Sequence, residues 1–353
     1  MTDIWIGTNA SPSSKGIYHC KFNTETGQLS QAELAAQVHG PGFLAMHPSG
    51  NVLYAVGSLD KTPSVIAYKI EAEGGNVKLD LLNSVAIGDG GAAHVSVDSK
   101  GKMLLTAQYG GGSVGVFSLA PDGSIIERTQ LVEHQGGSKV VKDRQDHPHA
   151  HWTGFSPDQK FAFVPDLGLD KIMIYRVDTE EASLSTHGFG EAPQGGGPRH
   201  MAFHPNGNWI YVVNELALTL SVFDFDAENG TMTRKQTIEA VPKEVMKREQ
   251  FNSGSEVCVH PNGRFVYSAN RGHDTISVYQ VDQTSGRLEV IQIEPIRGAT
   301  PRNFNIDPTG KWLLVAGQDS HTLASFVIDA ETGKLTYNRS IISVPSPICV
   351  LPR

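Results

Sequence analysis

The sequence has very little cysteine. Three of its 353 residues are cysteines, Cys20, Cys258 and Cys349, and they lie far apart with no CxxC pair. A disulfide framework needs more cysteines, and a structural zinc site uses them in local pairs, so we expect neither. This composition favours a protein of a reducing compartment, and we predict a cytoplasmic location.

Long hydrophobic runs and an excess of positive charge are also missing. No apolar run approaches the length of a membrane span, and the N-terminal MTDIWIGTNA lacks the basic and apolar regions of a signal peptide. The formal net charge of -8 disfavours a surface that follows nucleic-acid phosphates. We therefore expect no membrane or nucleic-acid partner. For the oligomeric state we predict a monomer or a weak homodimer.

An internal repeat runs through the chain. Six segments combine a turn, built from Pro, a polar residue and usually Gly, with a short run rich in β-branched and aromatic residues. They are HPSGNVLYAVG from His47, DSKGKMLLTAQ from Asp98, SPDQKFAFVPD from Ser156, HPNGNWIYVVN from His204, HPNGRFVYSAN from His260 and DPTGKWLLVAG from Asp307. They recur about every fifty residues, and the alternating runs around them predict four short strands per unit, which is typical of a propeller blade.

The two ends of the chain supply a seventh unit. The N-terminal IWIGTN and KGIYHCKF match the second and third strands of the repeat, and the C-terminal SPICVLP matches its first strand. We therefore predict an all-β, seven-bladed β-propeller with four-stranded antiparallel blades, whose last blade is closed by the N- and C-terminal segments. Residues 1–353 are expected to form a single domain. The rival architecture, a solenoid, would need polar capping repeats at each end.

Two inserts and two Gly-rich runs interrupt the regular pattern. The inserts, at 134–145 and 241–250, are predicted to be loops or a short helix, and each immediately precedes the first strand of a blade. The run GGG at 110–112 is predicted to form a tight hairpin. The run GGG at 195–197 is predicted to let the backbone reach Arg199 from an outer strand.

Chemically exceptional residues occupy two positions of the repeat. Six residues before the turn residue, where the other units have small side chains, stand His151, Arg199 and Arg302. Ten residues after it, Glu215 and Arg271 are the charged exceptions. Equivalent positions of the blades lie at one height around the channel, so we expect these five residues at one mouth of the ring. One His, one Glu and three Arg would form an anion site with an acid–base pair.

The segment HPHAH places three histidines at alternate positions, which in a strand would bring the imidazoles of His147, His149 and His151 to one face. Because no well-placed carboxylate or cysteine accompanies them in that stretch, we predict no metal. His149 is expected to face the pocket with His151 and to bind substrate, whereas His147 and His200 are expected to be structural. No Gly-rich run is followed by a helix-forming pattern, so neither a cofactor nor a serine nucleophile is predicted.

Together these motifs resemble a known family. GPRHMAFHPNGNWIYVVNEL, SANRGHDTISVY, ATPRNFNIDPTGKWLLVAGQDS and HPHAHWTGFSPD are similar to motifs of the bacterial propeller lactonases of the 6-phosphogluconolactonase type, relatives of the fungal 3-carboxy-cis,cis-muconate cyclase. The resemblance covers essentially the whole chain. In the fungal cyclase the proposed site has one His, two Arg and one Glu, which by motif implies His151, Arg199, Arg271 and Glu215 here.

The resemblance implies hydrolysis of a small anionic sugar lactone. Arg199, with Arg271 or Arg302, would bind the phosphate or carboxylate of the substrate and polarise the lactone carbonyl. His151, with a pKa near neutrality, would act as general base, and Glu215 would orient the His or an Arg or pass a proton to the leaving oxygen. Two alternatives stay open: a cycloisomerase of an unsaturated dicarboxylate, and a non-catalytic propeller that binds proteins or peptides.

Overall fold

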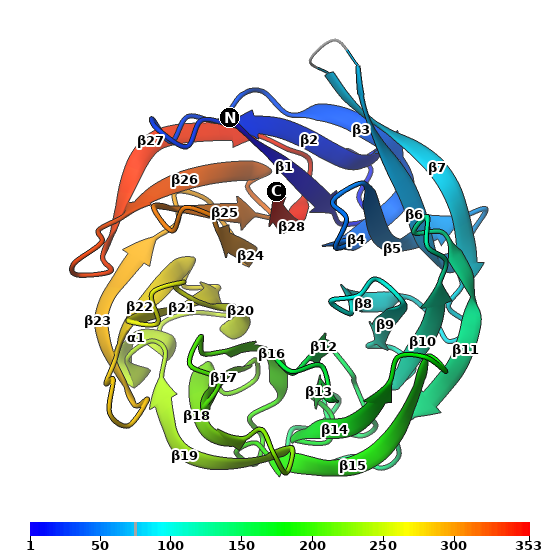
Figure 1. Ribbon diagram of the computed structural model, residues 1–353. Helices are drawn as coiled ribbons and strands as arrows, with labels where there is room; N and C mark the ends of the chain where they lie inside the picture. The colour runs from blue at the N-terminus through cyan, green and yellow to red at the C-terminus, as the bar shows by residue number, and fades with distance from the viewer. Residues whose placement is uncertain (74–75) are drawn as a thin grey trace.

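Seven four-stranded antiparallel sheets form a ring in the computed structural model, which describes residues 1–73 and 76–353 (Figure 1). The prediction of a seven-bladed β-propeller is confirmed. From the channel outward, blade 1 contains β4 (His39–Met46), β5 (Val52–Leu59), β6 (Thr62–Glu73) and β7 (Asn76–Ala86). Blade 2 contains β8 (Ala92–Val97), β9 (Met103–Gln108), β10 (Ser113–Leu119) and β11 (Ile125–Glu133). Blade 3 contains β12 (Gly154–Phe155), β13 (Phe161–Asp166), β14 (Lys171–Asp178) and β15 (Ser183–Glu191).

The remaining blades follow the same order from the channel to the rim (Figure 1). Blade 4 contains β16 (Pro198–Phe203), β17 (Trp209–Asn214), β18 (Thr219–Asp226) and β19 (Thr231–Glu239), and blade 5 contains β20 (Ser253–Val259), β21 (Phe265–Arg271), β22 (Thr275–Val281) and β23 (Leu288–Pro295). Blade 6 contains β24 (Pro301–Ile306), β25 (Trp312–Gly317), β26 (Thr322–Ile328) and β27 (Leu335–Ser343). Blade 7 contains β28 (Pro347–Pro352), β1 (Thr2–Thr8), β2 (Gly16–Phe22) and β3 (Glu33–Gln37).

The repeated turn segments also connect neighbouring blades. The Nδ1 atom of His204 accepts a hydrogen bond from the backbone N–H of Asn206 at 3.2 Å, so its Nε2 carries the proton. That Nε2 donates to the Gly263 carbonyl of the next blade at 2.8 Å, and His260 makes the equivalent bond to Gly310 at 2.8 Å. The histidines of the repeat therefore close a turn and bridge two blades at once.

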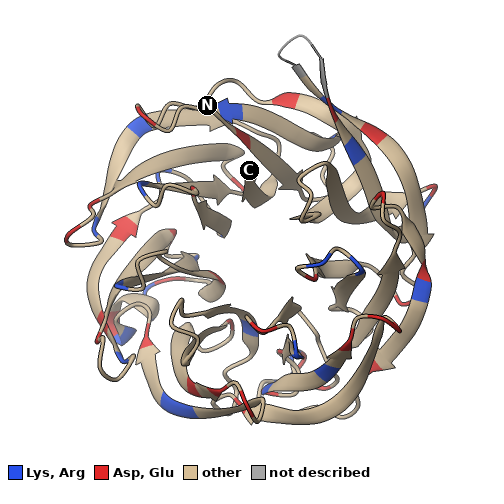
Figure 2. Cartoon of the chain, viewed as in Figure 1, with Lys and Arg blue, Asp and Glu red and all other residues tan. Residues whose placement is uncertain are grey.

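The hydrophobic core lies between adjacent blades. One cluster joins Tyr267 and Ile276 of blade 5 to Leu313 and Phe326 of blade 6, all of them buried. The Tyr267 hydroxyl also donates to the Gly333 carbonyl at 2.9 Å. Because the apolar side chains pack between the sheets, the channel in the middle of the ring is available for polar groups. Figure 2 shows charged residues of both signs distributed around the ring.

The two ends of the chain share blade 7, as predicted. β28 pairs antiparallel with β1, with Val350 opposite Ile6, and both termini lie at this blade in Figure 1. Cys349 and Cys20 are buried in the same blade as free thiols. Since β28 comes from the opposite end of the chain, this pairing closes the ring without a covalent link and covers the edge of β1.

The two inserts behave largely as expected. Residues 134–145 contain no helix or strand, whereas the second insert holds the short helix α1 (Lys243–Met246). The Gly-rich run at 110–112 lies in the turn between β9 and β10. Within residues 1–73 and 76–353, no helix has the length and apolar character needed to cross a membrane.

Deleting residues 347–353 should strongly destabilise the protein. The deletion exposes the edge of β1 and removes buried side chains such as Val350, each of which contributes about 1.5–3 kcal/mol. We expect a lower melting temperature and aggregation, measured by thermal unfolding and light scattering. Removing only the exposed Arg353 is the control and should change the melting temperature little. A truncated protein as stable as the full chain would contradict closure by β28.

Candidate active site

The five residues singled out in the repeat gather at one mouth of the ring. In an antiparallel blade the innermost strand starts, and the second strand ends, at the same end of the sheet. Arg199 and Arg302 lie at the starts of β16 and β24, Arg271 ends β21, and Glu215 follows β17. His151 lies just before β12. Their positions in the repeat thus translate directly into positions around the mouth.

Two cavities meet at this mouth. The larger, of about 550 Å³, is lined by His151, Glu215, Arg271 and Arg302 together with Tyr109, Arg144 and Phe251. The smaller, of about 200 Å³, is lined by His151, Arg199, His200 and Arg302 together with residues of the neighbouring blades that carry no charge. His151 and Arg302 face both cavities, so a ligand that extends through the two would pass between them.

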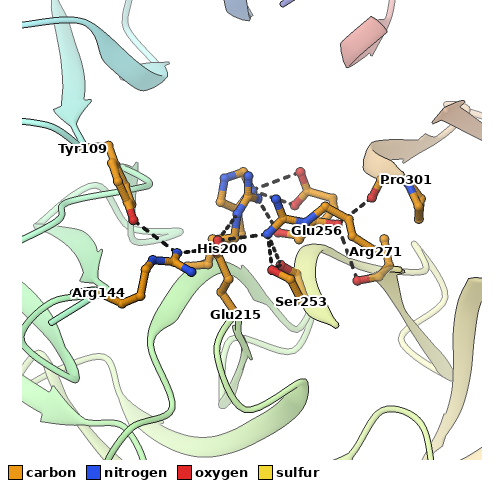
Figure 3. A network of polar contacts seen from close by, with 12 residues as sticks. Tyr109, Arg144, His200, Glu215, Ser253, Glu256, Arg271 and Pro301 are labelled. Atoms are coloured by element: carbon orange, nitrogen blue, oxygen red, sulfur yellow. Dashed lines mark hydrogen bonds and ion pairs between the residues drawn. The ribbon is translucent and has the colours of Figure 1, made fainter. Parts of the chain in front are cut away.

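The carboxylate of Glu215 holds three guanidinium groups. Its Oε2 lies 2.9 Å from Arg199 Nε and 3.1 Å from Arg271 Nη2. Its Oε1 accepts a hydrogen bond from Arg144 Nη2 at 2.7 Å, and the same Nη2 donates to the Tyr109 hydroxyl at 3.2 Å (Figure 3). Glu215 therefore organises the arginines, and no described contact joins it to His151.

Burial and charge act in opposite directions on Glu215. Burial raises its pKa, but the positive charges of Arg271 and Arg199 and the hydrogen bond from Arg144 outweigh this effect and lower the pKa to about 2. Glu215 is therefore ionised at neutral pH and is a poor proton donor. Of the two roles predicted for it, orienting an arginine is the one that this geometry supports.

The backbone fixes this cluster in place. Gly197 has a φ of +65°, and a Cβ at this position would lie 2.6 Å from Leu216 Cγ, so a larger residue does not fit. The Gly197 carbonyl accepts the backbone N–H of Glu215 at 2.7 Å. On the adjacent blade, Arg271 Nη2 donates to Ser253 Oγ at 2.5 Å. Glu215 and Arg271 are thus held from both sides of the ion pair.

Arg302 differs from the other arginines of the mouth. Its guanidinium has no hydrogen bond or ion pair with any residue in the described part of the chain, although it lines both cavities. Burial and the positive charge of Arg271 lower the pKa of Arg302. An unpaired guanidinium in such a position is prepared to bind a carboxylate or a phosphate.

His151 is buried at the junction of the cavities, with 4% of its surface exposed. Its Nδ1 has no hydrogen-bond partner, and its ring lies edge-on to those of Tyr109 and His200, at centroid distances of 5.5 and 5.1 Å. The expectation of a pKa near neutrality is wrong. Burial and the positive charges of Arg199 and its neighbours lower the pKa of His151 well below the usual value, so the ring is neutral at pH 7.

The HPHAH segment is not the regular strand that the alternate spacing suggested. Residues 147–153 are irregular apart from a single bridge between Ala150 and Asp166. His149 stacks on Tyr109 at a centroid distance of 4.3 Å and lies outside the described lining of both cavities. Its contact with a substrate therefore stays a prediction. No group of three or more metal-ligating side chains occurs among the described residues.

Sequence reasoning missed Arg144, which comes from the insert at 134–145. The neighbouring Gln145 is fully buried and its Nε2 donates to Asp170 Oδ1 at 2.6 Å and to the Leu167 carbonyl at 2.8 Å, which fixes the end of the insert. Phe251, which follows the second insert, also lines the larger cavity. The sequence signal for both residues was the extra length of the two units that contain the inserts. Each insert comes immediately before an innermost strand, where it must cross the mouth.

A cavity with arginines and a buried histidine around it has the features expected of a site for a small molecule. The chain matches the family described as "Lactonase, 7-bladed beta-propeller" over residues 3–352. It is 36% identical over 346 residues to a 6-phosphogluconolactonase of Bacillus subtilis (strain 168), which covers 98% of this chain and 97% of that protein. It is 33% identical over 335 residues to a 6-phosphogluconolactonase of Formosa agariphila, with coverages of 93% and 92%.

Solved structures agree with this relationship. The periplasmic gluconolactonase PpgL of Pseudomonas aeruginosa superposes with a TM-score of 0.91 at 28% identity, covering 99% of this chain and 98% of that one. The chain therefore belongs to the seven-bladed β-propeller lactonase family. The predictions of this family and of an enzyme are confirmed, and the non-catalytic alternative is set aside.

Replacing Glu215 should destabilise the fold because it leaves the buried guanidinium groups of Arg199 and Arg271, and the partly exposed one of Arg144, without a counter-charge. We expect Glu215→Gln to lower the free energy of unfolding by about 3–5 kcal/mol at pH 7, measured by denaturant unfolding. A carboxylate with a lowered pKa stabilises fully above its unfolded value of 4.5, so the difference should shrink as the pH falls towards about 2.

The matched control is Glu180→Gln, which removes the carboxylate of the exposed Lys102–Glu180 pair. It should leave the free energy of unfolding nearly unchanged, because solvent screens an exposed ion pair. Equal effects of the two substitutions would show that Glu215 does not balance the charge of the arginines.

Proposed function

We propose that this lactonase hydrolyses 6-phosphogluconolactone, or a closely related phosphorylated sugar lactone, to the open-chain acid. The Bacillus and Formosa relatives are named 6-phosphogluconolactonases. The observation that carries the proposal is the unpaired guanidinium of Arg302, which faces both cavities together with the buried imidazole of His151. A phosphate would supply the counter-charge that Arg302 lacks, while the lactone ring lies against His151.

His151 is the proposed general base. The neutral imidazole takes a proton from a water molecule, and the resulting hydroxide forms a bond to the lactone carbonyl carbon. Arg199 and Arg271, held by the ionised Glu215, stabilise the negative charge that develops on the carbonyl oxygen. The bond between this carbon and the ring oxygen then breaks, and His151 returns the proton to the leaving oxygen. The scheme uses no metal or organic cofactor.

We also propose a cytoplasmic location and a single domain. The free thiols of Cys20, Cys258 and Cys349 support a reducing compartment, although the similar PpgL is a periplasmic protein. A monomer or weak homodimer remains our prediction, since each element of the scheme comes from one chain.

His151→Ala should lower kcat for 6-phosphogluconolactone by about a hundredfold or more, because it removes the base. The measurement is acid release in a pH-stat, with spontaneous hydrolysis subtracted. His187→Ala, on rim strand β15 of the same blade, is the control and should leave kcat unchanged. An unsaturated dicarboxylate incubated in parallel tests the cycloisomerase alternative. Unchanged hydrolysis by the His151 variant would remove this residue from the mechanism.

Arg302→Met should discriminate between phosphorylated and unphosphorylated lactones. A hydrogen bond to a charged group contributes about 1.5–3 kcal/mol, so kcat/KM for 6-phosphogluconolactone should fall roughly ten- to a hundredfold, mainly through KM. The value for gluconolactone should change much less. The control is Arg297→Met, which alters an exposed arginine in the connection that leads into β24. Equal losses for the two substrates would assign Arg302 to the lactone carbonyl instead.

A further inference from the structure

A second buried carboxylate lies beside the cavities and has no part in the scheme above. Glu256 of β20 and His200 of β16 form a pair in which His200 Nδ1 lies 3.0 Å from both carboxylate oxygens (Figure 3). Both residues are buried, with 6% and 2% of their surfaces exposed. Burial and the positive charges of Arg199 and Arg302 lower the pKa of His200 well below its usual value, so its ring is neutral. The pair is therefore a buried hydrogen bond between an imidazole and a carboxyl group, and its position at the site calls for a chemical explanation.

The surroundings of Glu256 determine the tautomer of His200. Glu256 Oε2 accepts a hydrogen bond from Asn303 Nδ2 at 2.5 Å, and Oε1 accepts the backbone N–H of Val257 at 3.0 Å. Asn303 is fixed in turn, because its Oδ1 accepts the backbone N–H of Val350 at 2.7 Å. When Glu256 is ionised it can only accept, so His200 Nδ1 then carries the proton and its Nε2 presents a lone pair.

A buried ring nitrogen of His151 that lacks a hydrogen-bond acceptor lies near this lone pair. His200 Nε2 and His151 Nδ1 are both buried and both lack a hydrogen-bond partner. The two rings lie edge to face with centroids 5.1 Å apart, and both line the smaller cavity. If His151 takes a proton from water at Nε2, its Nδ1 carries the other proton, and His200 Nε2 is the nearby acceptor.

The charges around His151 disfavour its protonated form, so this form requires a partner that stabilises it. Arg199 and Arg302 oppose a positive charge on the His151 ring, and Glu215 is already engaged by three arginines. The general base nevertheless becomes an imidazolium during hydrolysis. Glu256, reached through His200, is the carboxylate whose charge remains available to stabilise that imidazolium.

We propose that His200 and Glu256 are positioning residues for the general base, which orient His151 and stabilise its protonated form during lactone hydrolysis. The inference rests on the proposed function of His151. As water transfers its proton to His151 Nε2, the Nδ1–H of His151 donates a hydrogen bond to His200 Nε2, and His200 Nδ1–H donates to Glu256. The proton from water is the only one transferred in this step, and it leaves with the ring oxygen of the opened lactone.

The arrangement should give the reaction a pH dependence. Burial outweighs the nearby Arg199 and the hydrogen bonds from Val257 and Asn303, and it raises the pKa of Glu256 to about 7. Protonated Glu256 would donate to His200 Nδ1 and move the His200 proton to Nε2, which could then no longer accept. Activity should therefore fall as the pH drops below about 7. The other titratable or charged groups near His200 are His94, His151, Arg199, Glu215, Arg271 and Arg302. Those near Glu256, besides His200, are Arg199 and the buried thiols of Cys258 and Cys349.

The test is Glu256→Gln in the full chain, with 6-phosphogluconolactone as substrate and kcat and KM measured from pH 5 to 8. We expect kcat at pH 8 to fall about tenfold or more with KM nearly unchanged, and the loss of activity below about pH 7 to disappear from the profile. The matched control is Asp3→Asn, which removes the carboxylate of the His19–Asp3 pair in blade 7. It should leave kcat and the pH profile as in the wild type.

The outcomes separate this inference from the proposed function. If the wild type hydrolyses the lactone and His151→Ala does not, but Glu256→Gln keeps the wild-type kcat and pH profile, the positioning role is overturned and the function stands. If the wild type shows no hydrolysis, the proposed function itself fails. Should Glu256→Gln not fold, as judged by circular dichroism, His200→Asn replaces it, and wild-type kcat in that variant would overturn the role equally.

Discussion

Charge balance around one buried carboxylate is the constraint on which this mouth depends. Glu215 neutralises part of the charge of Arg144, Arg199 and Arg271, and its lowered pKa keeps it ionised. Without it, the buried guanidinium groups of Arg199 and Arg271 would face each other without a counter-charge. Because they outnumber the carboxylate, the site keeps a net positive charge, and Arg302 is left unpaired for an anion.

The propeller makes this balance possible by collecting side chains that are distant in the sequence. Its apolar packing lies between blades, and its strand starts and ends converge on the channel. The ring also needs no apolar centre, so buried polar groups such as His151 and the Glu256–His200 pair can be held there by backbone carbonyls and neighbouring side chains. The closing contact of β28 with β1 stabilises all of these positions indirectly.

Much of the fold and part of the site could be predicted because the repeat is a local pattern. The turn segments beginning at His47, His204 and His260 appear in the sequence as they are used in the blades, and the C-terminal SPICVLP identified the shared blade. Arg199 and Arg271 stood out since they depart from the repeat at positions that the fold superimposes. Arg144 could not be found in this way, because an insert has no equivalent position in other blades.

The number of blades, the closure by the chain ends and the residue types at the mouth can all be inferred from the repeat in the amino-acid sequence. Which of these groups pair with one another becomes visible only in the folded ring. In the folded ring Glu215 pairs with the arginines rather than with His151, and Glu256 forms a hydrogen bond with His200. Burial in the ring also lowers the pKa of His151. The reason is physical: strand formation follows local periodicity, whereas the pKa of a buried group depends on burial and on charges that come from other blades.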